Sequence, residues 1–148
     1  MYKLDTPYGN EHDILLSVWE RSVRATHHFV TENDIELFKS IIKENRLFHH
    51  VDLVCVRSDD NTILGFMGVA GDSLEMIFVD AEWRKAGVGK MLVKHAIEIL
   101  HVVRVDVNEQ NEDALGFYQH FGFNVISRSA TDENGKPYPL LHLQRDEY

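Results

Sequence analysis

The chain has 148 residues, 44% hydrophobic and 26% charged, and a formal net charge of −9. This size suits one domain with a buried core, so we expect a single domain over residues 1–148. The negative charge argues against nucleic acid or an anionic membrane as a partner. No apolar run approaches about 18 residues and the N-terminus lacks an apolar h-region, so we predict no membrane span, secretory signal or transit peptide.

The single cysteine and the scattered histidines exclude two further classes of site. Cys55 alone cannot form an internal disulfide and fits a reducing, cytoplasmic environment. Its apolar neighbours Val54 and Val56 indicate a buried strand, so we expect an inert core thiol. Adjacent histidines, as at 27–28 and 49–50, seldom face one ligand, and no cysteine or carboxylate is spaced to complete a set. We therefore predict no metal site.

Two amphipathic helices are predicted near the N-terminus. The first covers about residues 13–23, and the residues expected on its buried face are Ile14, Leu15, Val18, Trp19 and Ser22. The second begins near Thr31, whose hydroxyl can cap it. Its expected buried stripe consists of Leu37, Phe38, Ile41 and Ile42. A short connection rich in polar rings, residues 25–29, joins the two helices.

The hydrophobic period then changes from helical spacing to two, which indicates strands. Residues 53–56 and 63–67 flank Asp59, Asp60 and Asn61 and predict a hairpin. Residues 74–79 predict a third strand, apolar except for one carboxylate.

The second half of the chain alternates helices and strands. A helix is predicted over about residues 87–100, with Val88, Met91, Leu92, Ala96 and Ile99 on its buried face. A strand over 102–107 and a helix around 114–121 follow. The final strands, 123–127 and 140–143, are joined across an Asn-Gly pair at 134–135 that suits a tight turn. The whole order predicts a mixed α/β fold, with helices on both faces of a sheet and an antiparallel hairpin at each end.

The turn after the third strand is the segment most informative about function. Gly87 and Gly89 have no side chains, so backbone N–H groups there can approach a ligand closely. The start of the next helix adds unpaired donors and a positive dipole end. With Arg84, Lys85 and Lys90 nearby, the segment favours a phosphate group, although two turn glycines beside solvated basic residues would give the same pattern.

The spacing Arg84-x-x-Gly87-x-Gly89 resembles the signature with which the GNAT family of N-acetyltransferases binds the pyrophosphate of coenzyme A. The next strand, loop and helix resemble the family in the same order and spacing, through Val105-Asp106-Val107, Asn111, Ala114, Tyr118 and Gly122-Phe123. Pieces around residues 19–29, 107–111 and 135–141 also resemble small bacterial YjaB-type acetyltransferases. The likeness therefore extends over nearly the whole chain.

This resemblance implies the GNAT fold, a central, mostly antiparallel twisted sheet flanked by helices on both faces. It also implies an enzyme that transfers an acetyl group from acetyl-CoA to a primary amine by direct attack. The acceptor stays open among small molecules, peptides and proteins. Exposed sheet edges would allow a homodimer.

The resemblance further implies which residues hold the cofactor. The backbone at Ile77 and Val79 would pair with the pantetheine arm, and an N–H group there would polarise the acetyl carbonyl. The pyrophosphate would lie on the loop formed by Arg84, Lys85, Ala86, Gly87, Val88, Gly89 and Lys90. Asn111 would lie beside the cofactor, and it would also serve as an N-cap.

The catalytic acid is assigned by the same likeness, whereas the base stays open. Tyr118 resembles the tyrosine that protonates the departing thiolate, although its place on an apolar stripe also fits a core residue. Glu75 is expected on the strand face of Ile77 and Val79, where burial would raise its pKa. Asp106 is the other carboxylate candidate. Either could instead be solvated or salt-bridged, with water relaying the proton.

The acceptor pocket is expected between the first helices and the final hairpin, from Trp19, Ser22, His27, His28, Phe29 and Tyr138. Two other functions fit parts of the pattern. One is a non-catalytic module that binds or senses acyl-CoA, which Tyr118 and a pocket carboxylate argue against. The other is an acetyltransferase of charged tRNA, which the net charge of −9 argues against.

Overall fold

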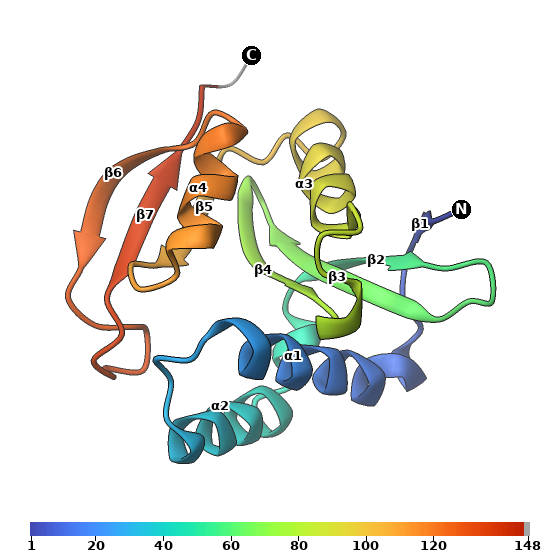
Figure 1. Ribbon diagram of the computed structural model, residues 1–148, viewed down its shortest axis with the longest axis horizontal. Helices are drawn as coiled ribbons and strands as arrows, with labels where there is room; N and C mark the ends of the chain where they lie inside the picture. Colours follow the sequence, from blue (N-terminus) through green and yellow to red (C-terminus); the bar gives the residue numbers. More distant parts are fainter. Residues whose placement is uncertain (147–148) are drawn as a thin grey trace.

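The computed structural model of the chain describes residues 1–146 and contains a seven-stranded sheet with the order β1-β2-β3-β4-β5-β7-β6 (Figure 1). The strands are β1 (Lys3–Asp5), β2 (Asp52–Arg57), β3 (Ile63–Ala70), β4 (Ser73–Val79), β5 (Arg104–Asn108), β6 (Asn124–Ser129) and β7 (Leu140–Gln144). Neighbouring strands are antiparallel except β4 and β5, which are parallel. The predicted mixed α/β fold is confirmed, with β1 as an additional edge strand outside the predicted first hairpin.

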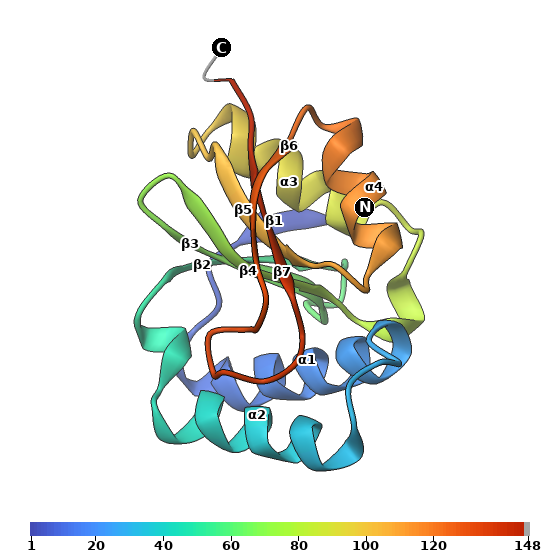
Figure 2. The same ribbon diagram turned by 90° about the vertical axis from the view of Figure 1, so that its left-hand side faces the viewer.

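Helices cover both faces of this sheet (Figures 1 and 2). On one face lie α1 (His12–Thr26) and α2 (Glu32–Glu44), and on the other lie α3 (Val88–Glu98) and α4 (Glu112–His120). Short 3-10 turns occur at η1 (Gly9–Glu11), η2 (Leu47–His49) and η3 (Ala81–Trp83). Each face has its own apolar core. The α1 side includes Leu15, Trp19 and Phe66, and the α3 side includes Leu64, Leu92 and Phe123.

The residues predicted on the buried faces of the helices are buried only in part. Thr31 caps α2 as expected, since its Oγ1 accepts a hydrogen bond from the Asp34 N–H group. However, Leu37 is 39% exposed, and Ile35 is the residue of α2 that is buried. The remaining stripe residues, Phe38, Ile41 and Ile42, are half-buried and line a pocket, and Phe38 and Ile42 also pack against the core as predicted.

Ile14 and Ile99 are exposed, although both were expected on buried helix faces. Ile14 lies at the margin of an apolar stripe centred on Leu15 and Val18. Ile99 is the C-cap residue, one position beyond the last residue of α3. Helical spacing locates a stripe well, but it does not show where the covering sheet ends.

The connection between β6 and β7 is longer than the predicted tight turn. Gly135, with φ of +75°, closes a turn by donating its N–H group to the Asp132 carbonyl at 3.1 Å. That turn is only the tip of a loop over residues 130–139. Pro137 and Pro139 lack the N–H groups that a strand ladder needs, so pairing cannot continue up to the turn.

Cys55 is fully buried in β2, as predicted, and burial raises the pKa of its thiol to about 11. This keeps the thiol protonated and unreactive at neutral pH.

A buried arginine attaches the N-terminal segments to the sheet. Arg57, at the end of β2, is 3% exposed. Its Nε donates to Asp5 on β1 at 2.7 Å, and its two terminal nitrogens donate to Glu11 at 2.9 and 2.7 Å. The guanidinium also lies 5.5 Å from the centre of the Tyr8 ring. One cation therefore joins β1 and the start of α1 to β2, and it lowers the pKa of Glu11 to about 2.

Replacing Arg57 by methionine should lower the free energy of unfolding at pH 7 by about 3 kcal/mol, because it removes a buried cation held by two carboxylates. Arg104→Met is the matched control. Arg104 is 60% exposed and pairs with Asp72, so its loss should cost less than about 1 kcal/mol. Urea unfolding followed by circular dichroism measures the free energy of unfolding of both variants.

The difference between the two variants should also depend on pH. The folded-state pKa of Glu11 is depressed from 4.5 to about 2, so the stability it contributes is complete above pH 4.5 and is lost as the pH falls toward 2. The Arg57→Met deficit should therefore shrink over that interval. Equal losses for the two variants at pH 7 would contradict this account of Arg57.

Candidate active site

The parallel strands β4 and β5 pair over a short distance and then separate. Their register contains two pairs, Ser73 with Arg104 and Leu74 with Val105. Beyond these pairs, the backbone edge of β4 that faces β5 has no strand partner among residues 1–146 (Figure 1). Opposite β3, Leu74 faces Val69 and the next paired residue is Met76, so Glu75 is an extra residue. Such a β-bulge bends a strand and increases its twist, which turns β4 away from β5.

The bulge also changes which residues share a face of β4. Leu74 packs with Ile77 and Val79 in the core beneath α3. Glu75 is exposed instead. The prediction that Glu75 alternates onto the face of Ile77 and Val79 is therefore wrong, because strict alternation fails at an inserted residue.

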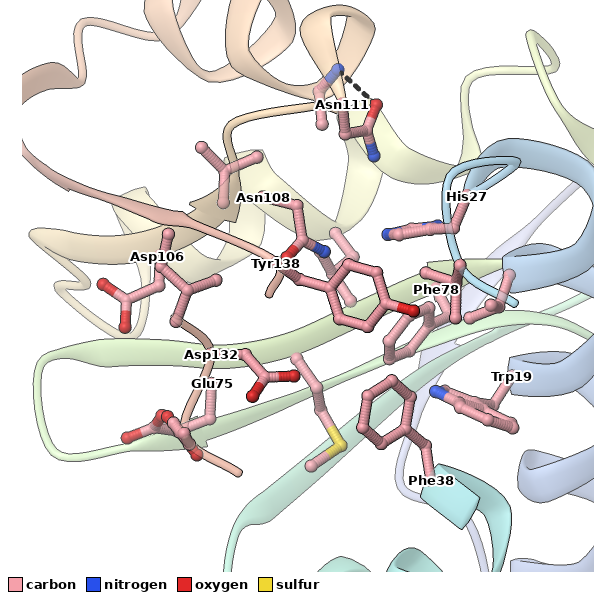
Figure 3. Close-up of a pocket in the computed structure, with 18 of the residues that line it drawn as sticks. Trp19, His27, Phe38, Glu75, Phe78, Asp106, Asn108, Asn111, Asp132 and Tyr138 are labelled. Atoms are coloured by element: carbon pink, nitrogen blue, oxygen red, sulfur yellow. Dashed lines mark hydrogen bonds between the residues drawn. The ribbon is translucent and has the colours of Figure 1, made fainter. Parts of the chain in front are cut away.

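A pocket of about 360 Å³ lies where the strands separate, between β4, β5, the first two helices and the 130–139 loop (Figure 3). Its two ends differ in chemistry. At one end lie the rings of Trp19, Phe38 and Phe78, and at the other lie the carboxylates of Glu75, Asp106 and Asp132 (Figure 3). Glu133 also lines the pocket. The volume and the mixture of apolar walls with a few polar groups are typical of a small-ligand site.

The loop before β7 is tied to the N-terminal helices and forms one wall. Tyr138 is 5% exposed, and its hydroxyl donates to the Asp34 carboxylate and accepts from the Thr31 N–H group at 3.3 Å. Lys136 Nζ lies 3.2 Å from the same carboxylate. Both ends of the chain therefore build the pocket.

His27 points its ring into the pocket (Figure 3), and its hydrogen bonds define its tautomer. The Thr26 hydroxyl donates its one proton to the Ser22 carbonyl at 2.8 Å, so it must accept from His27 Nδ1 at 2.7 Å. Nε2 is then left with its lone pair. Burial lowers the pKa of His27 to about 4, so the ring is neutral at pH 7.

Tyr118 reaches the pocket from α4. This helix is capped by Asn111, whose Oδ1 accepts from the Ala114 N–H group at 3.2 Å. Tyr118 is 5% exposed and packs against Phe117 and Phe123. Within residues 1–146, the Tyr118 hydroxyl has no hydrogen-bond partner. Every fully buried polar side-chain atom in those residues does have a partner, so this hydroxyl is not fully buried and opens onto the pocket. Burial raises the pKa of the phenol, which stays protonated at neutral pH.

The carboxylates at the acidic end have different environments. Partial desolvation at the pocket wall raises the pKa of Glu75, and the charges of Glu133 and Asp106 raise it further. Asp106 is hydrogen-bonded to the His142 ring, since its Oδ1 lies 2.7 Å from His142 Nδ1. Glu75 therefore holds a proton more readily than a fully solvated glutamate does.

The glycine loop begins where β4 ends and leads into α3. Asp80 is 8% exposed and accepts hydrogen bonds from Arg21 of α1 at 2.7 to 3.2 Å, which fixes the start of this turn. Gly87 has φ of +87° and directly precedes α3, and a β-carbon added there would meet nothing within 4 Å. The space before the helix is therefore open.

Close packing sets the position of this helix start. A β-carbon at Gly65 of β3 would lie 2.8 Å from Val88 Cγ1, so only glycine lets the first turn of α3 sit against the sheet. The first N–H groups of a helix lack intrahelical acceptors and carry partial positive charge. Together with exposed Arg84, Lys85 and Lys90, they suit a diphosphate.

The structure brings together some of the predicted site residues and separates others. Those that line the pocket are Trp19, His27, Glu75, Ile77, Asp106, Asn111, Tyr118 and Tyr138. Val79 and residues 84–90 lie outside its lining, at the end of β4 and the start of α3. Ser22 is buried in α1, His28 is exposed, and Phe29 packs beside the rings of His27 and Tyr138 without lining the pocket.

Sequence reasoning did not single out several pocket residues, namely Phe38, Phe78, Asn108, Asp132 and Glu133. Phe38 belongs to the predicted core stripe of α2, and it both packs against that core and lines the pocket. Asn108 is the last residue of β5 and follows the predicted strand 102–107, and a polar side chain at the end of a strand often marks a site. The two acidic residues belong to a loop whose position depends on contacts far away in the sequence.

Comparison with known proteins decides the family. The model of the acetyltransferase (GNAT) domain matches residues 50–125, from β2 through the glycine loop to α4. The peptidyl-lysine N-acetyltransferase YjaB of Escherichia coli is 41% identical over 137 residues, covering 90% of this chain and 89% of that protein. This chain belongs to the GNAT acetyltransferase family. It is an acetyl-CoA-dependent N-acetyltransferase, as predicted.

Solved structures agree with this GNAT assignment. The solution structure of apo YjaB from Escherichia coli superposes with a TM-score of 0.87 at 33% identity, covering 100% of this chain and 99% of that one. The PaiA N-acetyltransferase of Thermoplasma acidophilum, solved with coenzyme A, has a TM-score of 0.79 at 18% identity over 99% of both chains, which shows a shared fold. Within residues 1–146, no helix is long and apolar enough to span a membrane.

The ring of His27 should titrate near pH 4, because burial disfavours its charged form. An NMR titration of the histidine ring protons, with the His27 resonance assigned by its loss in His27→Gln, measures this. Exposed His28 on the neighbouring position serves as the internal comparison. A His27 midpoint near the ordinary value of 6.5 would contradict a buried neutral ring.

Proposed function

We propose that this GNAT enzyme acetylates the side-chain amine of lysine in peptides or proteins. The YjaB protein of Escherichia coli, named for that activity, is 41% identical to this chain. The observation that carries the proposal is the two-ended pocket. Its aromatic end suits the methylene stem of a lysine, and its carboxylates attract the ammonium group.

The acetyl donor is proposed to lie along the unpaired edge of β4. In the described part of the chain, backbone groups from Ile77 to Val79 have no strand partner on the β5 side and can pair with the amides of the pantetheine arm. An N–H group there would polarise the acetyl carbonyl, an effect worth about 3 kcal/mol in comparable sites. The loop of residues 84–90 would bind the pyrophosphate, and Asn111 would lie beside the cofactor.

Gly87→Glu should weaken acetyl-CoA binding at least about tenfold, because it places bulk and negative charge before the start of α3. Gly71→Glu is the matched control, since Gly71 also has positive φ and open space around it, but lies in the β3–β4 turn. Both variants carry similar backbone strain, so their stabilities should fall alike. Calorimetric titration with acetyl-CoA should show weaker binding for Gly87→Glu alone; equal affinities would remove the loop from the cofactor site.

Tyr118 is proposed as the general acid that protonates the departing thiolate. Its hydroxyl is unpaired within the described chain and opens onto the pocket, and burial keeps it protonated until a strong base forms beside it.

Tyr118→Phe should lower kcat about 100-fold with little change in acetyl-CoA affinity, because it removes a proton donor and keeps the ring packing. Tyr8→Phe, at an exposed position, should leave both unchanged. Steady-state kinetics with a free-thiol assay measure kcat, and calorimetry measures the acetyl-CoA affinity. Wild-type turnover in Tyr118→Phe would exclude the acid role.

Glu75 is proposed as the general base for the acceptor amine, directly or through water. It lies on the β4 bulge beside the pocket, and its raised pKa brings it closer to the working pH. Asp106 is the weaker candidate, because its carboxylate is already hydrogen-bonded to His142.

The proposed acceptor is tested with paired peptides that have either a free lysine side chain or only a free α-amine. The lysine peptide should be acetylated at least about tenfold faster by kcat/KM, and Glu75→Gln should lower its kcat by about 100-fold. Site-specific mass spectrometry identifies the product. Preference for the α-amine would refute the lysine proposal, and an active Glu75→Gln enzyme would refute only the base.

We further propose that residues 1–148 act as one domain, in the cytoplasm, without nucleic acid or membrane as partner. The net charge of −9 and the single buried thiol support this. The edge strand β6 exposes Val125 and Ile126, which supports pairing of two copies as a homodimer.

A further inference from the structure

Three polar side chains on β5, β7 and β6 form a hydrogen-bonded row beside the acetyl-transfer pocket. His142 Nδ1 lies 2.7 Å from Asp106 Oδ1, and His142 Nε2 lies 2.6 Å from Ser129 Oγ. An ionised carboxylate can only accept, so the neutral ring carries its proton on Nδ1. Nε2 then has the lone pair, and the Ser129 hydroxyl donates to it. The chemistry of the three groups therefore assigns every proton in the row.

The sheet holds this row rigidly and leaves it accessible. Asp106 and His142 are register partners on neighbouring strands, and residues on either side of each, such as Val105 and Leu143, are buried beneath α3 and α4. The row therefore lies on the opposite face of the sheet. There Asp106 is 46% exposed and His142 is 29% exposed, so a small molecule can reach them. Side chains on paired strands keep their geometry better than side chains on loops.

We propose that Ser129 is a nucleophile and that Ser129, His142 and Asp106 form a second catalytic site, which hydrolyses small activated acyl esters or thioesters. The arrangement supplies a serine hydroxyl, an imidazole lone pair to accept its proton, and a carboxylate that holds the ring and stabilises its charged form. This order of contacts, rather than any position in the sequence, is what activates a serine.

A donor for the developing oxyanion is also available. The N–H group of Ala130, the residue after Ser129, has no hydrogen-bond acceptor within residues 1–146. In α/β-hydrolases the residue after the nucleophile supplies one of the oxyanion donors through its backbone. Ala130 lies just beyond the end of β6, where the strand ladder no longer occupies that N–H group.

The reaction balances with the groups present. Ser129 Oγ bonds to the acyl carbon while its proton moves to His142 Nε2, and the bond to the leaving oxygen or sulfur breaks as that atom takes the proton from His142. Water then attacks the acyl-serine and passes its proton to Nε2. The carboxylic acid leaves, and the proton returns to Ser129 Oγ.

The test uses the full-length enzyme without acetyl-CoA, p-nitrophenyl acetate as substrate, and a fluorophosphonate probe. Wild type should release p-nitrophenolate well above the buffer rate and carry one label, which mass spectrometry places on Ser129. Ser129→Ala and His142→Gln should each lose at least about 90% of the hydrolysis and the label. Ser127→Ala, two residues earlier on the same strand, is the matched control and should keep both.

Measuring acetyl transfer in the same variants distinguishes this second site from the acetyl-transfer pocket. Ser129→Ala should keep the wild-type acetyltransferase kcat and acetyl-CoA affinity, which also shows that it folds, whereas Tyr118→Phe should keep ester hydrolysis. An unlabelled wild-type protein would overturn the proposal. So would hydrolysis that persists in Ser129→Ala, because the reactivity would then belong to another group such as an exposed histidine.

Discussion

The site depends on the separation of β4 from β5. Two register pairs hold these parallel strands together, and the inserted Glu75 then bends β4 away. The opening has an unpaired strand edge on one side, the Tyr118 hydroxyl on another, and the start of α3 beyond the end of β4. If the two strands stayed paired along their lengths, the backbone of β4 would be satisfied by β5 and no cleft would remain for a thioester.

Basic and acidic side chains gather at different places in a protein that is acidic as a whole. Arg84, Lys85 and Lys90 lie at the start of α3, whereas Glu75, Asp106 and Glu133 lie around the far end of the pocket. An anionic nucleotide portion and a cationic amine can therefore each meet favourable local charge, although the net charge is −9. Local arrangement, more than the total, determines what such a surface attracts.

The sequence predicted the local structure of the glycine loop and of α4 better than the lining of the pocket. The glycine loop, the Asn111 cap and the apolar stripe of α4 are specified by neighbours within a few residues, so their spacing is sufficient to identify them. The position of Glu75 was mispredicted because a bulge breaks alternation, and the place of Phe38 in the pocket lining, in addition to the core, depends on a loop far away in the sequence. β1 was missed because it is three residues long and is held by Arg57 rather than by its own propensity.

The hydrogen bond between Tyr138 and Asp34 has a consequence for the order of folding. It joins residues 104 positions apart, whereas the glycine loop, Asn111 and Tyr118 follow one another closely in the chain. Closing a long loop costs entropy that only the finished contact repays. The segment from the glycine loop to α4 can thus condense from local contacts, whereas the contact that ties the 130–139 loop to α2 forms at a greater cost in chain entropy.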